Sequence, residues 1–296
     1  MKKVTFWGWY SDYDISTIES LKVEYNVRNE SMSKAMRVLL GLCKLLSYKR
    51  LLYVLYNILI VKKLNKSELV IFSDDIIFYE LIFEEILSKR KIIVFRNKIP
   101  ANFENRIEKL RACGFEMYTF DNTDAVYYKI INKGQYLPCL YKFKIRDQKN
   151  SAYFLGLNKG RELILNKLSF KLLEHGIVPD ITLVKKYNFG LKIYRGKISY
   201  CENIKKLLSS TYVIDVVSEG QTGLTLRALE AVFYNRKLIT NNSSIKQYDF
   251  FNENNILIFN NNIEIPHLFI TNNYSPIPRE ILYKYTAEYY YKDIIG

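Results

Sequence analysis

The sequence predicts an α/β protein with two domains, each built around a parallel β-sheet. Short apolar runs rich in β-branched residues alternate with segments of helical periodicity along most of the 296 residues. The 49% apolar content is enough for two ordinary cores. Periodicity is lost and charge rises over residues 132–150, which predicts the linker there. We therefore expect a first domain over residues 1–145, a second over 151–275, and a C-terminal helix over 276–296 that packs back on the first domain.

The first domain is expected to contain four strands whose carboxyl ends carry polar residues. The strands are predicted at residues 4–9, 67–73, 91–95 and 115–120, and residues 10–16 are interpreted as a loop. Helices are predicted at 78–87 and at a segment ending at Ala112, with Gly114 as its C-cap. In a parallel sheet the carboxyl ends of the strands face the ligand crevice, so Asp74, Asp75, Arg96 and Asp121 are expected near a site.

The second domain repeats this plan around its most regular stretch, residues 213–242. A strand at 213–217, a turn-forming loop at 218–223, a helix from Leu224 and a strand at 238–240 form one βαβ unit. The exposed backbone N–H groups of such a loop and of the first helical turn favour phosphate. The other strands are predicted at 151–156, 181–184 and 256–259, and the other helices at 162–175, 201–209 and 280–291.

The cysteine content, the N-terminus and the net charge indicate the cellular compartment and the kind of partner. The four cysteines lie far apart without a CxxC pair, which favours reduced thiols in the cytoplasm and disfavours a structural metal site. The N-terminal apolar run is too short for a signal peptide. A net charge of +14 favours anionic partners, or reflects Lys-rich solubility alone. No nucleic-acid-binding motif accompanies it, so nucleic acid is not expected as a partner.

Residues 33–61 form the most apolar long segment. The uncharged stretch after Arg50 has only 11 residues, whereas a bilayer span needs about 20. Basic residues trace a narrow polar stripe on this helix or helix pair. The segment is therefore expected either to pack in the core or to lie in the plane of an anionic membrane. If one face of it is exposed, one face could pack in the core while the other contacts the membrane.

The stretch from Gln221 to Glu230, followed by 237–242 and 248–250, resembles the C-terminal half of bacterial lipopolysaccharide and capsule biosynthesis proteins. Residues 154–156 with 159–161, and 96–97 with 114–121, match that group in order and spacing. These proteins are similar to glycosyltransferases of the GT-B type, which have two Rossmann-like domains facing across a cleft. The resemblance covers most of residues 65–260, and it implies sugar transfer from a nucleotide diphosphate donor to a growing lipid-linked surface polysaccharide at the inner face of the cytoplasmic membrane.

The resemblance also implies roles for particular residues. In many such transferases two glutamates eight positions apart serve the donor, and the later one binds the ribose; here that role falls on Glu230, while Thr222 occupies the earlier position. Fixed positive charge neutralises the leaving diphosphate where no metal is used, so no metal or other cofactor is expected. The predicted donor-nucleotide-binding residues are Lys159, Arg161, Gln221, Thr222, Gly223, Arg227 and Glu230. Arg227 is alternatively interpreted as an (i, i+3) partner that orients Glu230.

An inverting reaction would also need a base beside the acceptor hydroxyl, supplied by the first domain. Asp12, Asp14 and Asp74 are candidates by position, although each is alternatively a loop or capping aspartate. Asp12-Tyr13-Asp14 resembles the DxD metal motif of another class of sugar transferases, but its place after the first strand disfavours a metal. The alternative function is a non-catalytic nucleotide- or partner-binding scaffold of a polysaccharide assembly complex, which the missing first glutamate suggests.

Overall fold

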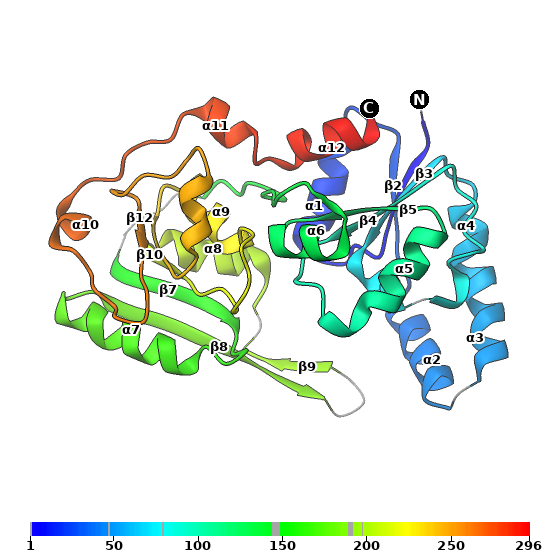
Figure 1. Ribbon diagram of the computed structural model, residues 1–296, viewed down its shortest axis with the longest axis horizontal. Coiled ribbons are helices and arrows are strands. Elements are labelled where there is room, and N and C mark those ends of the chain that lie inside the picture. Colours follow the sequence, from blue (N-terminus) through cyan, green and yellow to red (C-terminus); the bar gives the residue numbers. More distant parts are fainter. Residues whose placement is uncertain (1, 47, 79, 144–148, 189–191, 197) are drawn as a thin grey trace. The chain divides into compact units, whose positions relative to one another are not determined.

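The chain forms two compact α/β units, each with its own parallel sheet (Figure 1). The computed structural model describes residues 2–46, 48–78, 80–143, 149–188, 192–196 and 198–296. The first unit consists of Met1–Gly134 with Tyr290–Gly296, and the second of Gln135–Tyr289. The predicted α/β class with two parallel-sheet domains is confirmed. Residues 144–148 of the predicted linker lie outside the described residues.

The first sheet has the order β2-β1-β3-β4-β5-β6, and every neighbouring pair is parallel. The inner strands are almost wholly apolar and buried, as expected for a parallel sheet covered on both faces. The strands are β1 (Val4–Trp7), β2 (Val27–Glu30), β3 (Leu69–Ser73), β4 (Arg90–Phe95), β5 (Phe115–Thr119) and β6 (Ile131–Asn132). The main helices are α1 (Asp12–Leu21), α2 (Lys34–Leu45), α3 (Lys49–Tyr56), α5 (Glu104–Ala112) and α6 (Asn122–Tyr128), with a π-helix η1 (Asn57–Val61) and α4 (Lys62–Leu64) after α3.

The second sheet has the order β12-β11-β10-β7-β8-β9, in which five strands are parallel and β9 is antiparallel to β8. Figure 1 shows the end of β8 and β9 extending as a ribbon from this sheet. The strands are β7 (Lys149–Leu157), β8 (Val178–Asn188), β9 (Lys192–Arg195), β10 (Ser210–Asp215), β11 (Lys237–Thr240) and β12 (Ile256–Ile258). The helices are α7 (Glu162–Glu174), α8 (Tyr200–Leu208), α9 (Leu226–Phe233), α10 (His267–Thr271) and α11 (Arg279–Tyr283).

The C-terminal segment differs from the single helix predicted at residues 280–291. It forms α11 and then α12 (Ala287–Ile295), and the Thr286 hydroxyl accepts a hydrogen bond from the Tyr289 amide at the start of the second helix. The end of α12 packs within the first unit, where Tyr291 contacts Phe6 edge-to-face and the Ile294 carbonyl accepts a hydrogen bond from Arg90.

Two other predictions for the first unit were wrong. Residues 10–16 are not a loop, because Ser11 begins α1 with a capping box in which Asp14 reaches back to the Ser11 amide. Residues 78–87 do not form an amphipathic α-helix; among the described residues there, the structure contains the short 3₁₀ helix η3 (Glu80–Ile82). The Asn65 side chain binds both the Glu85 carbonyl and the Leu87 amide, which holds the end of this segment in a turn.

Residues 33–61 form the predicted helices, with α2 and α3 packed side by side (Figure 1). Leu40 and Cys43 from α2, and Leu52 and Tyr56 from α3, are buried in the core of the first unit. Nowhere in the described ranges is there a helix with both the length and the apolarity needed to span a membrane.

Candidate functional site

The carboxyl edge of the second sheet carries three polar loops. They follow β7 at residues 158–161, β10 at 216–225 and β11 at 241–243. Because these three strands are parallel, their loops meet at one edge of the sheet. This edge brings together Arg161 and Arg227 from the predicted donor set, as well as the loop that contains Gln221, Thr222 and Gly223.

Arg227 connects α9 to two strands at this edge. Its guanidinium donates one hydrogen bond to Asp215 Oδ1 at 2.9 Å and another to the Leu155 carbonyl at 2.7 Å. It also lies over the Phe154 ring, 4.4 Å from the centroid. Asp215 is only 1% exposed. The ion pair of Arg227 is thus with Asp215, whereas the sequence suggested an (i, i+3) pair with Glu230.

Gly156 makes room for this guanidinium. A Cβ at position 156 would lie 3.0 Å from Nη2 of Arg227, closer than nine in ten real Cβ contacts. The glycine therefore lets β7 approach Arg227, which explains the presence of a residue without a side chain near the end of the strand.

Arg161 is the second cation of this edge. It occupies the N-cap position of α7, and its Nε atom is buried with no hydrogen-bond partner in the structure. Burial and then the nearby charge of Arg227 lower the pKa of Arg161, and only Asp215 opposes them. Arg161 and Arg227 are two cations, and Asp215 is the one buried carboxylate that acts on both. The three groups together carry a net positive charge, which favours binding of an anion.

The loop after β10 is fixed by amide side chains from the loop after β11. Asn242 Nδ2 donates to the carbonyls of Thr222 and Gly223 at 3.4 and 3.3 Å, and Asn241 Oδ1 accepts from the Val217 amide at 2.7 Å. Gln221 donates to the Gly223 carbonyl within the same loop. The loop is therefore held in place before α9 begins.

Helix α9 begins beside this loop with a side-chain cap. The Thr225 hydroxyl accepts a hydrogen bond from the Ala228 amide at 3.0 Å. The remaining first-turn amides add a partial positive charge at the same edge as Arg161 and Arg227.

Glu230 lies one turn further along α9 and is 3% exposed. Burial raises the pKa of its carboxyl group to about 7, while hydrogen bonding from Tyr200, the charge of Arg227 and the Asn203 amide act in the opposite direction. Tyr200 and Asn203 belong to α8, so Glu230 faces that helix. Its ribose-binding role stays a prediction.

Lys159 is exposed in the turn after β7. Its φ of 42° and the φ of 79° at Gly160 place two consecutive residues in the left-handed region. This turn reverses the chain from β7 into α7, and the Asn158 side chain accepts a hydrogen bond from the Glu162 amide at the start of that helix.

A pocket of about 580 Å³ opens at the same edge of the second sheet. It lies at the ends of β11 and β12 and beside the first turn of α7. Its volume falls in the range of about 300–1,000 Å³ typical of small-ligand sites. The lining combines apolar side chains with amides, a hydroxyl and an ammonium group, from Ile164, Asn241, Ser243, Lys246, Ile258, Phe259, Asn260 and Asn261.

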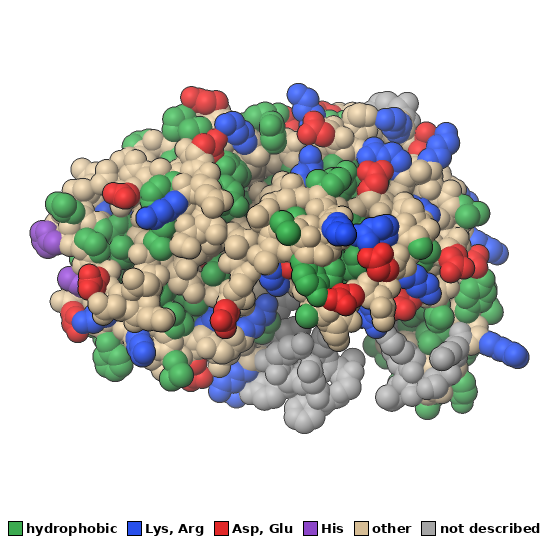
Figure 2. Space-filling model, in the orientation of Figure 1, with side chains coloured by type: hydrophobic (Ala, Val, Ile, Leu, Met, Phe, Trp, Pro, Cys, Tyr) green, Lys and Arg blue, Asp and Glu red, His purple; other side chains and the backbone are tan. Residues whose placement is uncertain are grey.

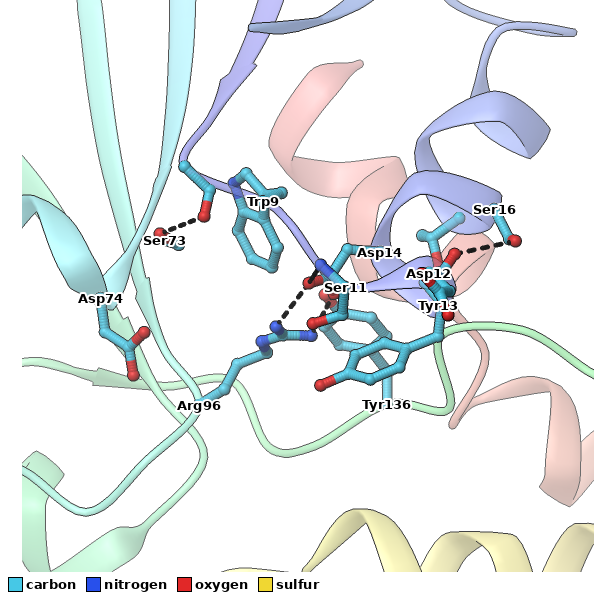
Figure 3. Close-up of polar contacts among 12 residues, drawn as sticks. Trp9, Ser11, Asp12, Tyr13, Asp14, Ser16, Ser73, Asp74, Arg96 and Tyr136 are labelled. Atoms are coloured by element: carbon cyan, nitrogen blue, oxygen red, sulfur yellow. Dashed lines mark hydrogen bonds and ion pairs between the residues drawn. The ribbon is translucent and has the colours of Figure 1, made fainter. Parts of the chain in front are cut away.

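In the first unit, Arg96 and Asp14 form a bidentate ion pair at the carboxyl edge of the sheet. Nη1 and Nη2 of Arg96 contact the two Asp14 oxygens at 2.6 and 3.0 Å (Figure 3). The guanidinium also lies 4.6 Å from the ring centroid of Trp9 and 5.4 Å from that of Tyr13. Asp14 is 3% exposed and is shared between the helix cap and Arg96. Its capping role agrees with the alternative interpretation from sequence, whereas its ion pair with Arg96 had no sequence signal.

The other two candidate bases lie in different surroundings. Asp12 is exposed in the first turn of α1, where its carbonyl accepts a hydrogen bond from Ser16. Asp74 follows β3, accepts a hydrogen bond from Asn97 at 2.9 Å, and lines a pocket of about 200 Å³ together with Lys98 and Phe103. Of the three aspartates, Asp74 has the surroundings best suited to contact a bound molecule.

The turn after β1 depends on Gly8, and its replacement by alanine should destabilise the first unit. Gly8 has a φ of 84°, and an added Cβ would lie 2.7 Å from Ser73 Oγ, which now donates to the Gly8 carbonyl. We expect Gly8→Ala to lower the free energy of unfolding by about 2–3 kcal/mol, because left-handed strain and a steric clash add.

Gly134→Ala is the matched control for that measurement by urea denaturation. Gly134 has a similar φ of 75° but nothing within 4 Å of an added Cβ. We expect it to cost about 1 kcal/mol, from strain alone. Equal losses for the two variants would show that the contact with Ser73 is unimportant.

Sequence reasoning missed three residues that shape the second-unit site: Asp215, Tyr200 and Asn242. Asp215 did leave a signal, because it is the one acidic residue within the β-branched run 213–217. An acid in a buried strand needs a cation or hydrogen-bond donors nearby. Tyr200 and Asn242 had no comparable signal, since their contacts depend on packing between distant segments.

Comparison with known proteins adds no family assignment. No protein-family model matches the chain, and neither a curated protein nor a solved structure matches it. Within the described parts of both units, no group of three or more histidine, cysteine, aspartate or glutamate residues is placed to hold a metal ion.

Proposed function

We propose that this protein is a metal-independent glycosyltransferase that uses a nucleotide diphosphate sugar as donor. The observation that carries the proposal is the pair Arg161 and Arg227 at the carboxyl edge of the second sheet, with Asp215 as their buried counter-charge. Fixed cations and helix N-termini can stabilise a leaving diphosphate without a metal. The adjoining pocket of about 580 Å³ offers amide and hydroxyl groups for the nucleoside.

In this proposal the phosphates lie between Arg161, Lys159 and the start of α9. The Nε–H of Arg161 is proposed to donate a hydrogen bond to a phosphate oxygen. The exposed Lys159 can approach the phosphates from the turn after β7. The loop from Gln221 to Gly223 provides the backbone close to the donor, and Glu230 is proposed to contact the ribose.

The acceptor is proposed to be a lipid-linked, growing surface polysaccharide of the lipopolysaccharide, O-antigen or capsule type. Its hydroxyl oxygen attacks the anomeric carbon as the bond to the β-phosphate breaks, and the nucleotide diphosphate leaves with the electron pair. In an inverting reaction Asp74 would take the proton, since it lines a pocket in the first unit. This chemistry requires the GT-B arrangement, in which the two Rossmann-like domains face a common cleft and the C-terminal helix returns to the first. The reaction would take place at the inner face of the cytoplasmic membrane.

Calorimetric titration with ADP, GDP, UDP and CDP tests the donor site. We expect at least one nucleotide to bind, and Arg161→Gln to weaken that binding by about 10- to 100-fold, because a charge-assisted hydrogen bond is lost. Lys167→Gln is the control, since it removes an exposed cation from the same helix α7. Failure of all four nucleotides to bind, or equal binding by the Arg161 variant, would contradict the proposal. Binding without sugar transfer to any acceptor would favour the scaffold alternative.

A further inference from the structure

The described side chains of the α2–α3 hairpin form two apolar faces, one covered by the core of the first unit and one exposed. The first face supplies Leu40, Cys43, Leu52 and Tyr56 to the core of the first unit. The second face is exposed although it is also apolar. A helix that is apolar on all sides usually has a further partner or a membrane against it.

The exposed side chains follow helical spacing rather than being scattered. On α2 they recur at positions 38, 39 and 42, with position 46 directly after the helix, and on α3 and the following π-helix they recur at 51, 54 and 58, so each set forms a stripe along one side. Figure 2 shows hydrophobic side chains around the position that α2 and α3 occupy in Figure 1. The exposed residues are Val38, Leu39, Leu42, Leu46, Leu51, Val54 and Ile58, each between 43% and 58% exposed.

The charge of this segment has one sign. Residues 31–67 contain eight lysines and arginines and no aspartate or glutamate. Among the described side chains four of these cations, Arg50, Lys62, Lys63 and Lys66, are exposed, and Lys63 is paired with Glu30. The apolar surface is therefore accompanied by cations that would repel a second copy of the same hairpin and attract an anionic surface.

We propose that the α2–α3 hairpin is a membrane-docking element that lies in the plane of an anionic phospholipid bilayer. Its exposed aliphatic stripes would enter the boundary between headgroups and acyl chains, and the surrounding lysines and arginines would contact lipid phosphates. Both helices are too short to cross the bilayer, so the element binds one leaflet. The proposal goes beyond sugar transfer and does not depend on it, because docking needs neither donor nor acceptor.

Sedimentation of the full chain with vesicles tests this inference. We expect binding to vesicles of phosphatidylglycerol and phosphatidylcholine, and at least about tenfold weaker binding to phosphatidylcholine alone. The double variant Leu42→Ser with Leu51→Ser should reduce binding to the anionic vesicles by about tenfold or more, because two leucines no longer enter the bilayer. The double variant Arg50→Glu with Lys62→Glu should reduce binding by a similar factor through charge alone.

The control is Leu163→Ser with Phe170→Ser, which removes two exposed apolar side chains from α7 in the second unit. We expect this variant to bind anionic vesicles as the wild type does. All of these positions are exposed, so unchanged circular dichroism should accompany each variant. The inference is overturned if the wild type binds no vesicles, if the α7 variant loses binding as strongly as the hairpin variant, or if the hairpin substitutions instead abolish a dimer in solution.

Discussion

Replacement of Arg227 by alanine is expected to lower the free energy of unfolding by about 3–5 kcal/mol, because it leaves a buried carboxylate without its cation. Asp215 is 1% exposed, and its other hydrogen bond in the structure is a long one of 3.4 Å from the Thr240 hydroxyl. The variant also loses the contact with the Phe154 ring and the donor to the Leu155 carbonyl. Urea denaturation followed by circular dichroism measures the loss.

Two further variants separate the buried charge from other effects of the substitution. Lys171→Ala breaks an exposed (i, i+3) pair with Glu174 and should change the free energy of unfolding by less than about 1 kcal/mol. Asp215→Asn in the Arg227→Ala background removes the buried carboxylate that has lost its cation. This double variant should recover part of the lost free energy of unfolding. A loss for Arg227→Ala no greater than that for Lys171→Ala would show that the Asp215 pair does not stabilise the second unit.

The inner strands of both sheets could be predicted from sequence because parallel strands are buried on both faces. Such strands are continuous apolar runs, and the observed strand at Leu69–Ser73, for example, consists of Leu, Val, Ile, Phe and Ser, all buried. The edge strands β2 and β6 were not predicted, because they are short and most of their residues are exposed or half-buried. The antiparallel strand β9 was not predicted either. Strand β9 is stabilised by pairing with the end of β8, and no local sequence pattern predicts this pairing.

The first helix was missed although its capping box from Ser11 to Asp14 is a local signal, whereas the segment at 78–87 depends on a contact with a residue distant in sequence. Asp12-Tyr13-Asp14 suggested a loop, yet Asp14 both caps α1 and binds Arg96, 82 residues away. The apolar spacing at 78–87 suggested a helix, yet Asn65 holds the end of that segment. In the second case a side chain distant in sequence holds the local structure.

For the candidate site, the sequence could predict the loops but not the partners of their side chains. The position of Arg161, Arg227 and the 218–223 loop at one edge followed from strand order alone. The pairing of Arg227 with Asp215 and the burial of Glu230 against α8 depend on how helices pack on the sheet. Helix packing is set by many weak contacts between distant residues, so periodicity alone does not predict it.

The stability of the wild type relative to Glu230→Gln is expected to decrease as the pH rises from about 4.5 to about 7. Burial raises the pKa of Glu230 to about 7, above an ordinary value of 4.5. In this window the folded protein keeps a proton that the unfolded chain has released, so its contribution to stability is greatest below the window and is lost through it. The difference should be on the order of 3 kcal/mol, since one pKa unit corresponds to about 1.4 kcal/mol.

Thermal or urea unfolding of both proteins at pH 4.5, 6 and 7.5 measures this difference, and glutamine keeps the shape of the side chain and its ability to accept a hydrogen bond. Glu253→Gln, at an exposed position, is the control and should follow the wild type at every pH. The charged groups that act on Glu230 are Arg227 and Asp215, and they are present in both proteins. A difference that stays constant with pH would contradict the raised pKa, and one that grows with pH would mean that Arg227 and Tyr200 hold Glu230 ionised.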